Sequence, residues 1–378
     1  MEPPEILEQC YNTAQSRLDS PLIEEGSSDL QAIVESSTRA PIRFLMACLL
    51  AKIHRPSIDI RKPYAEIGDS ESYSGRAYDE RYITSFILKY ELPCNTTTAF
   101  LTPAFRTLNI PLTQDVELQG KPREVYQKVI KILHKVQAGQ VDSRLLLEEI
   151  VRRLILYREQ RNQQIDQMKR QVENRSDNES VSVDQIVNLL KQHLSCPHSS
   201  RLPVLIISAA YHTAQDLINK QANALHSHTA ADRSTGSVGD IEIVQLITKE
   251  IVIVYEVKSR KITSEDINLA VQKLNDLPYS HQISQYVFIT IEPAEEFLHK
   301  VAADLYKKTG VEFMILDCLE FVKHFLHLFY ERRISFLNEY QRLVLEEPES
   351  AVSHELKLAF LALRLALTTA ASQENELE

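Results

Sequence analysis

The sequence predicts a mixed α/β protein, in which a mostly helical N-terminal domain precedes a domain with a central mixed sheet flanked by helices. Three observations predict this class. Apolar residues recur at helical spacing through most of residues 5–55 and 123–172. At residues 238–258 that spacing gives way to alternating apolar and polar residues and to runs of β-branched residues, and strand patterns then alternate with helical patterns. Only 8 of the 378 residues are glycine and 7% are aromatic, which agrees with a helix-rich chain.

The N-terminal part contains one irregular stretch. An apolar stripe over residues 42–53 predicts a helix, which Pro56 ends. From there to residue 122 the helical period weakens, and residues 72–76 and 93–98 are its least periodic pieces. Because loops on a rigid scaffold often carry recognition, we expect this stretch to contact a partner.

A polar segment divides the chain. Helical spacing over residues 123–172 ends at the octet 173–180, which combines charged and small polar residues. Such a segment has no apolar face to bury, so it predicts a linker. We therefore expect a mostly helical N-terminal domain over residues 1–175 and a linker over residues 176–183.

The second domain is predicted over residues 184–345, and a C-terminal helix with an acidic tail over residues 346–378. Short β-branched runs predict strands, and apolar residues three and four apart predict helices. The expected strands are 240–247, 251–255, 285–291 and 311–316, and the expected helices are 184–195, 202–224, 264–277, 294–308, 318–343 and 351–371.

Charge and cysteine content exclude several function classes. The chain has 42 Lys and Arg against 52 Asp and Glu, so DNA must be held by a local basic surface. Five scattered cysteines disfavour disulfides, and His193, Cys196 and His198 are expected to have a structural or surface role rather than to bind zinc. The sequence shows no signal peptide, long apolar run, P-loop or nucleophile elbow, so we expect a cytoplasmic protein without a membrane segment or nucleotide cofactor.

Three residues on two consecutive predicted strands form a candidate catalytic pattern. Asp240 lies on the first strand, and Glu256 and Lys258 lie on the next. Residues i and i+2 of a strand point to one face, so Glu256 and Lys258 stand together. Asp240 heads the preceding antiparallel strand and can lie opposite them. Two carboxylates and an amine then converge at one place. The alternative is a solvated strand edge with a cross-strand charge pair.

These residue types suit magnesium chemistry. Carboxylates of Asp240 and Glu256, with the backbone carbonyl of Val257 and waters, are the oxygen ligands that Mg²⁺ prefers. Lys258 can then orient or deprotonate the attacking water. Asp232 and Glu242 remain outer-shell possibilities.

The order of helix, Asp240 strand, Glu256-x-Lys258 strand, helix and strand resembles the PD-(D/E)xK nuclease superfamily over residues 200–317. The resemblance implies Mg²⁺-dependent phosphodiester hydrolysis, with Asp240 and Glu256 as metal ligands and Lys258 as the water-activating residue. One departure is that the superfamily usually has a strand before the Asp strand, whereas only residues 226–239 intervene here.

A narrower resemblance spans most of the chain. Residues 58–64 (IDIRKPY), 74–80 (SGRAYDE) and 92–100 (LPCNTTTAF) are similar to SacI-family type II restriction endonucleases. That resemblance implies cleavage of double-stranded DNA at a specific sequence, by a homodimer if the site is two-fold symmetric.

DNA contacts are expected from the irregular N-terminal stretch. Arginine forks suit guanine edges or phosphates, and Asn and Thr offer small polar contacts. The alternative for each residue is a solvated side chain without a contact. The candidates are Arg76, Tyr78, Arg81, Asn95, Thr96 and Thr97, whereas an exposed helix face is expected for Arg152, Arg153, Arg158 and Arg161.

Three functions remain open from the sequence. The leading hypothesis is a sequence-specific endonuclease; the others are a structure-dependent or repair nuclease and a non-catalytic DNA-binding protein with a nuclease-like fold. Retention of Asp240, Glu256 and Lys258 disfavours the last, because a degenerate copy is expected to lose at least one.

Overall fold

The computed structural model describes residues 1–23, 27–95, 97–174, 181–225, 238–276, 283–292 and 294–375. The chain divides into two compact units, Met1–Gln164 and Ile165–Glu378, and the division falls within one long helix, α7.

The N-terminal unit is helical. Its elements are α1 (Pro3–Ser16), α2 (Ser27–Val34), α3 (Ala40–His54), η1 (Ala65–Ile67), α4 (Gly75–Tyr78), η2 (Asp79–Ile83), α5 (Thr84–Lys89), η3 (Ala99–Leu101), α6 (Arg123–Gln137) and α7 (Ser143–Glu173).

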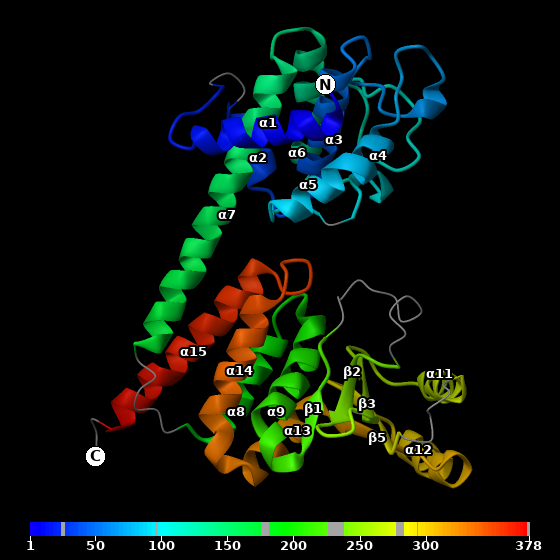
Figure 1. The fold of residues 1–378 in the computed structure, drawn as a ribbon, viewed down its shortest axis with the longest axis vertical. Helices are drawn as coiled ribbons and strands as arrows, with labels where there is room; N and C mark the ends of the chain where they lie inside the picture. Colours follow the sequence, from blue (N-terminus) through cyan, green and yellow to red (C-terminus); the bar gives the residue numbers. More distant parts are fainter. Residues whose placement is uncertain are drawn as a thin grey trace. The chain divides into compact units, whose positions relative to one another are not determined.

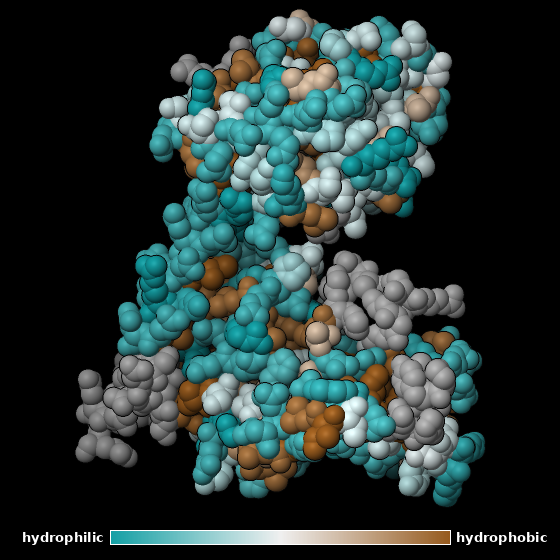
Figure 2. Space-filling view, in the orientation of Figure 1, coloured by the Kyte–Doolittle hydropathy of each residue, from teal (hydrophilic) through white to brown (hydrophobic). Residues whose placement is uncertain are grey.

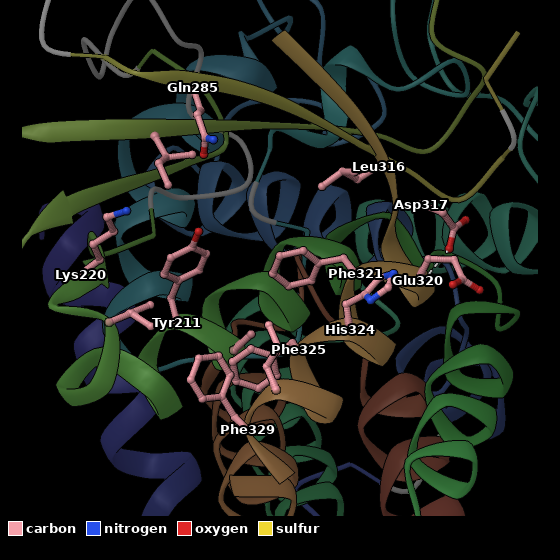
Figure 3. A pocket seen from close by; sticks show the side chains of 14 residues that line it. Tyr211, Lys220, Gln285, Leu316, Asp317, Glu320, Phe321, His324, Phe325 and Phe329 are labelled. Carbon is pink, nitrogen blue, oxygen red and sulfur yellow. Dashed lines mark hydrogen bonds between the residues drawn. The ribbon is translucent and has the colours of Figure 1, made fainter. Parts of the chain in front are cut away.

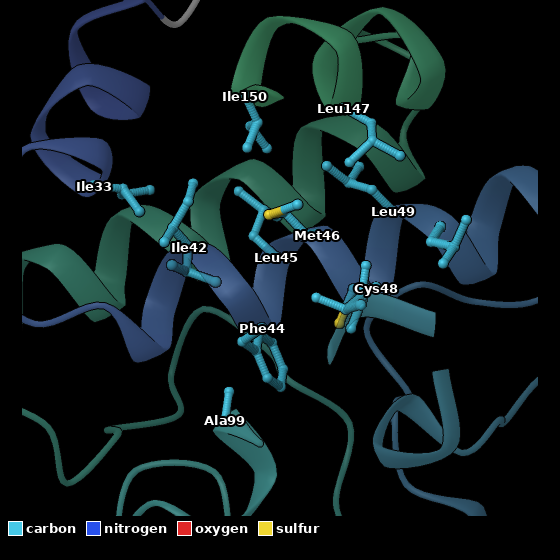
Figure 4. Close-up of a cluster of buried hydrophobic side chains, with 14 of the residues drawn as sticks. Ile33, Ile42, Phe44, Leu45, Met46, Cys48, Leu49, Ala99, Leu147 and Ile150 are labelled. Carbon is cyan, nitrogen blue, oxygen red and sulfur yellow. The ribbon is translucent and has the colours of Figure 1, made fainter. Parts of the chain in front are cut away.

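Helix α3 forms the centre of the N-terminal core. Residues 40–51 of this helix are all buried and, apart from Arg43, none of them is charged, as expected for a helix enclosed by others. Figure 4 shows Phe44 directed toward Ala99 of η3, and Leu147 and Ile150 of α7 on the other side of α3. The predicted stripe over residues 42–53 therefore marks a core helix.

The stretch expected to be loop-like is partly helical. Ser74 caps α4 by accepting a hydrogen bond of 3.2 Å from the backbone N–H of Ala77. The π-helical turn η2 follows directly and continues into α5. The sequence did not show a helical spacing of apolar residues here, because α4 has only four residues and the π-helical turn η2 has more residues per turn than an α-helix.

The C-terminal unit combines a sheet with helices. Its elements after α7 are α8 (Val183–Leu194), η5 (Ser199–Arg201), α9 (Leu202–Ile218), β1 (Lys220–Ala222), β2 (Ile241–Gln245), β3 (Ile251–Lys258), α11 (Ser264–Asn275), β4 (Gln285–Thr290), α12 (Glu296–Thr309), β5 (Glu312–Asp317), α13 (Cys318–Leu328), η7 (Tyr330–Arg332), α14 (Arg333–Glu346) and α15 (His354–Asn375).

The five strands form one mixed sheet in the order β1-β2-β3-β4-β5. β1, β2 and β3 pair antiparallel, whereas β3, β4 and β5 are parallel. The helical crossovers α11 and α12 make the parallel pairings possible, because parallel neighbours need a long connection. The prediction of a mixed α/β fold with a mixed sheet is confirmed.

The strand β1 corrects the predicted extent of the preceding helix. A helix was expected through residue 224, but α9 ends at Ile218 and β1 begins at Lys220. Asn219 between them adopts the left-handed conformation, with φ of 54°, which ends a helix and is tolerated by asparagine. A short strand therefore does precede the Asp240 strand. It lies before residues 226–239, in the part of the chain that was expected to be the end of the helix.

The two faces of the sheet carry separate cores. Alternate residues of β3 divide between them, since Ile253 and Tyr255 join the cluster with α8, α9, α13 and α14, and Val254 joins the cluster with α11 and α12. Figure 1 shows α11 and α12 apart from the group of α8, α9 and α14, with the strands between. The face on which Glu256 lies is therefore the α11–α12 face.

The arginines of α7 correct another expectation. Arg152 and Arg153 were expected on an exposed face, but each is only 7% exposed and both pair with the fully buried Glu149. Arg161 is buried as well. Ion pairing three and four residues apart lets these guanidinium groups enter a packed region.

The surface is mixed. On the face drawn in Figure 2, hydrophilic side chains predominate and hydrophobic ones gather in small groups. No helix in the described ranges has the length and apolar character needed to cross a membrane.

Candidate active site

The ends of β2 and β3 bring the sequence-predicted residues together. The register pairs Ile241 with Tyr255, so Asp240 comes next to Glu256 across the two strands. Facing residues of an antiparallel pair share one face of the sheet. Asp240 is exposed, and Glu256 and Lys258 are half-buried.

A glycine allows the chain to approach β3 closely just before Asp240. A Cβ on Gly239 would lie 2.6 Å from Cγ1 of Val254 and 2.7 Å from the backbone oxygen of Tyr255. Real Cβ atoms do not approach so closely, so a side chain here would push residue 239 away from β3. Gly239 therefore places Asp240 at the strand edge.

Asp240 is held by the backbone of the neighbouring strand. The N–H of Val257 donates to Oδ2 of Asp240 over 2.7 Å. The carboxylate thereby lies at the level of the Glu256–Lys258 segment.

Glu256 receives hydrogen bonds from three side chains on three elements. Lys258 Nζ lies 2.8 Å from Oε1, and Lys273 Nζ of α11 lies 3.3 Å from Oε2. The hydroxyl of Tyr286 on β4 donates to Oε2 over 3.1 Å. The Glu256 side chain is 13% exposed, so this carboxylate is largely removed from water and neutralised by ammonium groups.

Glu242 has a structural position beside the site. Its carboxylate accepts hydrogen bonds from the backbone N–H of Val238 at 3.0 Å and from Nδ2 of Asn223 at 3.2 Å. These bonds anchor the chain that leads into Asp240. Asp232, the other outer-shell possibility, lies outside the described residues.

The donor set fits a hard divalent cation. Carboxylate oxygens of Asp240 and Glu256 at the ends of adjacent strands, close to the Val257 backbone, are ligands of the type that Mg²⁺ takes. The described ranges contain no group of three or more His, Cys, Asp or Glu side chains placed to hold a metal. A Mg²⁺ ion at these two carboxylates would take waters or substrate oxygens as its other ligands, as Mg²⁺ usually does.

Sequence reasoning missed Lys273 and Tyr286. Lys273 follows Ala270 by three residues on α11, and Ala270 is buried against the sheet, so helical spacing directs both toward that face. Tyr286 shares a face of β4 with Phe288, which pairs with Glu256 in the register. The sequence predicted the helix that carries Lys273, but it did not predict how that helix packs on the sheet.

Three predicted DNA contacts lie on α4 and η2. Arg76 forms an exposed ion pair with Glu80 at 2.7 Å. The hydroxyl of Tyr78 hydrogen-bonds Nδ1 of His54 at 2.6 Å, and its ring packs within the N-terminal core. Arg81 is exposed. Arg76 and Arg81 can therefore reach a ligand, whereas Tyr78 also has a structural role.

The other three predicted contacts follow α5. The backbone oxygen of Asn95 accepts a hydrogen bond from Arg43, and Thr97 is exposed. Thr96 lies outside the described residues. The buried pair of Arg43 and Asp79, 2.6 Å apart, connects this segment to α3 and η2.

His193 is a core residue, which decides between the structural and the surface role left open by the sequence. Its Nδ1 lies 2.9 Å from the hydroxyl of Tyr340, and its Nε2 lies 3.0 Å from the backbone oxygen of Leu356. Burial lowers the pKa of His193 to about 4, against a smaller opposing effect of the Leu356 carbonyl. Both ring nitrogens are engaged, so this histidine is structural.

A hollow of about 540 Å³ lies on the opposite face of the sheet. Figure 3 shows the rings of Tyr211, Phe321 and Phe325 around it, with Lys220 and Asp317 at opposite ends. It shares no residue with the Asp240–Glu256 site.

The fold and site define a mixed α/β domain with a carboxylate pair and lysines at the ends of two paired strands. Residues 178–290 match the family model of the SacI restriction endonuclease C-terminal domain. This segment is therefore similar to a restriction endonuclease domain, as the sequence led us to expect, and it runs from before α8 to the end of β4. None of the curated proteins compared with the chain matches it.

Proposed function

We propose that the protein is a Mg²⁺-dependent, sequence-specific endonuclease of double-stranded DNA, of the type II restriction class. The observation that carries the proposal is the convergence of Asp240, Glu256 and Lys258 at the ends of β2 and β3, inside the segment that matches a restriction endonuclease domain. The order α9, β1, β2, β3, α11 and β4 supports a PD-(D/E)xK core.

Each residue has a separate task in this proposal. Asp240 and Glu256, with the carbonyl of Val257, would hold the metal. Bound Mg²⁺ supplies charge neutralisation at the scissile phosphate and acidifies water. Lys258 orients the attacking water through Nζ, and only as the neutral amine would it accept the proton of that water. Tyr286 and Val257 hold the two carboxylates in place through the hydrogen bonds described above.

The N-terminal unit is proposed to read the DNA sequence. Exposed Arg76, Arg81 and Thr97 are the candidates that the structure leaves accessible at the surface. Because each chain carries one such site and duplex DNA has two strands, a homodimer is part of the proposal. A structure-dependent nuclease would use the same catalytic residues but grip phosphates without reading bases.

The test is incubation of the purified protein with phage DNA in Mg²⁺, in Ca²⁺ and in EDTA. Discrete fragments in Mg²⁺ alone are expected, because Ca²⁺ binds oxygen ligands but activates water poorly. Asp240→Asn, purified identically, is the control for contaminating nuclease and must be inactive. A smear would favour a structure-dependent nuclease, and DNA binding without cleavage would favour a non-catalytic protein.

A further inference from the structure

Lys273 has no task in the proposed reaction, yet its ammonium group lies against the proposed metal ligand Glu256. Lys273 Nζ is 3.3 Å from Oε2, while Lys258 Nζ is 2.8 Å from Oε1. Each oxygen of this carboxylate therefore faces a cation. The second cation comes from a different element, the helix α11, whose packing against the sheet brings it there.

The position of Lys273 on α11 is set by its neighbours. Ala270 and Leu274 are buried in the cluster between α11 and the sheet, and Lys273 lies beside them in the last turn. Unpaired carbonyls at the C-terminal end of a helix favour a cation there. The ammonium is thereby directed over the edge of the core and toward Glu256.

The two lysines already offset the charge of the two proposed metal ligands. Asp240 and Glu256 contribute two negative charges, and Lys258 and Lys273 contribute two positive ones. A divalent cation bound by Glu256 would be repelled by both ammonium groups and would compete with them for the carboxylate oxygens. Binding of the cation therefore favours the departure of one lysine from Glu256.

Lys273 is the lysine better suited to leave. Its contact with Glu256 is the longer of the two, and its side chain is 32% exposed against 25% for Lys258. Tyr286 also donates to Oε2 and is neutral, so it can keep the carboxylate oriented after the lysine has moved.

We propose that Lys273 is a positioning residue that acts as a built-in counter-cation: it holds Glu256 in the metal-free protein and is displaced from it when a divalent cation binds. The inference rests on the proposed function and adds a form of regulation to the same site. Competition between the lysine and the metal lowers the affinity of the site for metal.

The test measures Mn²⁺ binding by titration calorimetry, without DNA. Lys273→Gln removes the charge but keeps an N–H donor for Glu256, so we expect its dissociation constant for Mn²⁺ to fall about tenfold. Lys273→Arg keeps the charge and should retain the parental value. Lys300→Gln on α12 is the matched control, because Lys300 is 75% exposed and pairs with Glu296 away from the site.

A second measurement needs no variant. In the parent protein, acylation of lysines by an amine-reactive reagent can be mapped by mass spectrometry with and without Mn²⁺. Release from Glu256 should raise the reactivity of Lys273 severalfold when Mn²⁺ is added, while Lys300 stays constant. Unchanged or lower reactivity of Lys273 would overturn the inference.

The outcomes separate the inference from the proposed function. If the parent binds Mn²⁺, Asp240→Asn does not, and Lys273→Gln binds with parental or weaker affinity, the inference is wrong and the metal site stands. If the parent binds no divalent cation, both fail.

Discussion

The backbone N–H of Val257 donates a 2.7 Å hydrogen bond to the carboxylate of Asp240, so the residue at the head of β2 is tied to the strand that carries Glu256 and Lys258. At this end of the sheet, a hydrogen bond from backbone to side chain connects β2 and β3 where a hydrogen bond between two backbone groups would otherwise be expected. The geometry of the proposed metal site therefore depends on how closely residues 239–240 approach β3.

Gly239→Ala should damage the site through that approach. The added methyl group would meet the Tyr255 backbone at 2.7 Å, which can be relieved only by moving the chain that carries Asp240. We expect cleavage to fall at least tenfold, with a stability loss of about 1–3 kcal/mol from overpacking. Gly310→Ala is the control, because Gly310 has a φ of 73° and open space around its Cα, so strain there lowers stability without moving Asp240. Equal cleavage by both variants, measured in single turnover, would contradict the prediction.

Lys258→Ala should slow the chemical step and spare DNA affinity. General acid and base groups contribute about 10²- to 10⁴-fold, so a loss in this range is expected in single-turnover cleavage. Binding in Ca²⁺ should stay within a few fold of the parent. A loss that lies mainly in the dissociation constant would instead identify Lys258 as a phosphate contact.

Asp79→Ala should destabilise the N-terminal unit strongly. The variant leaves the Arg43 guanidinium buried without its ion partner, and it removes acceptors for Thr98 and the Ala99 N–H at 2.7 and 2.8 Å. Breaking a buried pair costs about 3–5 kcal/mol, measured by urea unfolding. Glu80→Ala breaks only the exposed pair with Arg76 and should cost under about 1 kcal/mol. A similar decrease in the free energy of unfolding in both variants would show that the buried Arg43–Asp79 pair contributes no more to stability than the exposed pair.

Arg76→Ala and Arg81→Ala distinguish base reading from phosphate contact. A contact to a guanine edge should cost about 1–3 kcal/mol on the cognate duplex and relax discrimination at one base pair. A phosphate contact should weaken binding to all duplexes alike and lower the salt slope by about one. The dissociation constants are measured by titration with cognate and scrambled duplexes at several salt concentrations. If both variants bind every duplex as tightly as the parent protein, other residues must recognise the DNA.

Stability should decrease as the pH falls below about 6.5, partly because of His193. Its pKa is about 4 when folded and near 6.5 when unfolded, so the unfolded chain binds the extra proton between these values. The contribution is constant above 6.5 and is lost toward pH 4, by at most about 1.4 kcal/mol per pH unit. His193→Gln should be less stable at pH 8 but show a shallower decline. An identical slope in parent and variant, by urea unfolding at each pH, would rule out His193 as a source.

The sequence alone determined the local features of this protein. The β-branched run at residues 251–255 predicted a strand, because that preference is local, and the strand period of two placed Glu256 and Lys258 on one face. The position of Asp240 beside Glu256 followed from an antiparallel connection too short for any other pairing. Mixed α/β architecture followed from the alternation of the two periods.

Only the tertiary structure decided which distant side chains complete the site. Lys273 and Tyr286 reach Glu256 from 17 and 30 residues away, through the packing of α11 and the parallel pairing of β4 with β3. No local pattern encodes those distances. Arg152 was likewise expected on an exposed face, yet it is buried and also donates to the backbone oxygen of Leu18, which is distant in the sequence. Burial of a charge depends on a partner supplied by the folded chain, and that is why the sequence pattern, which records only neighbours along the chain, did not predict it.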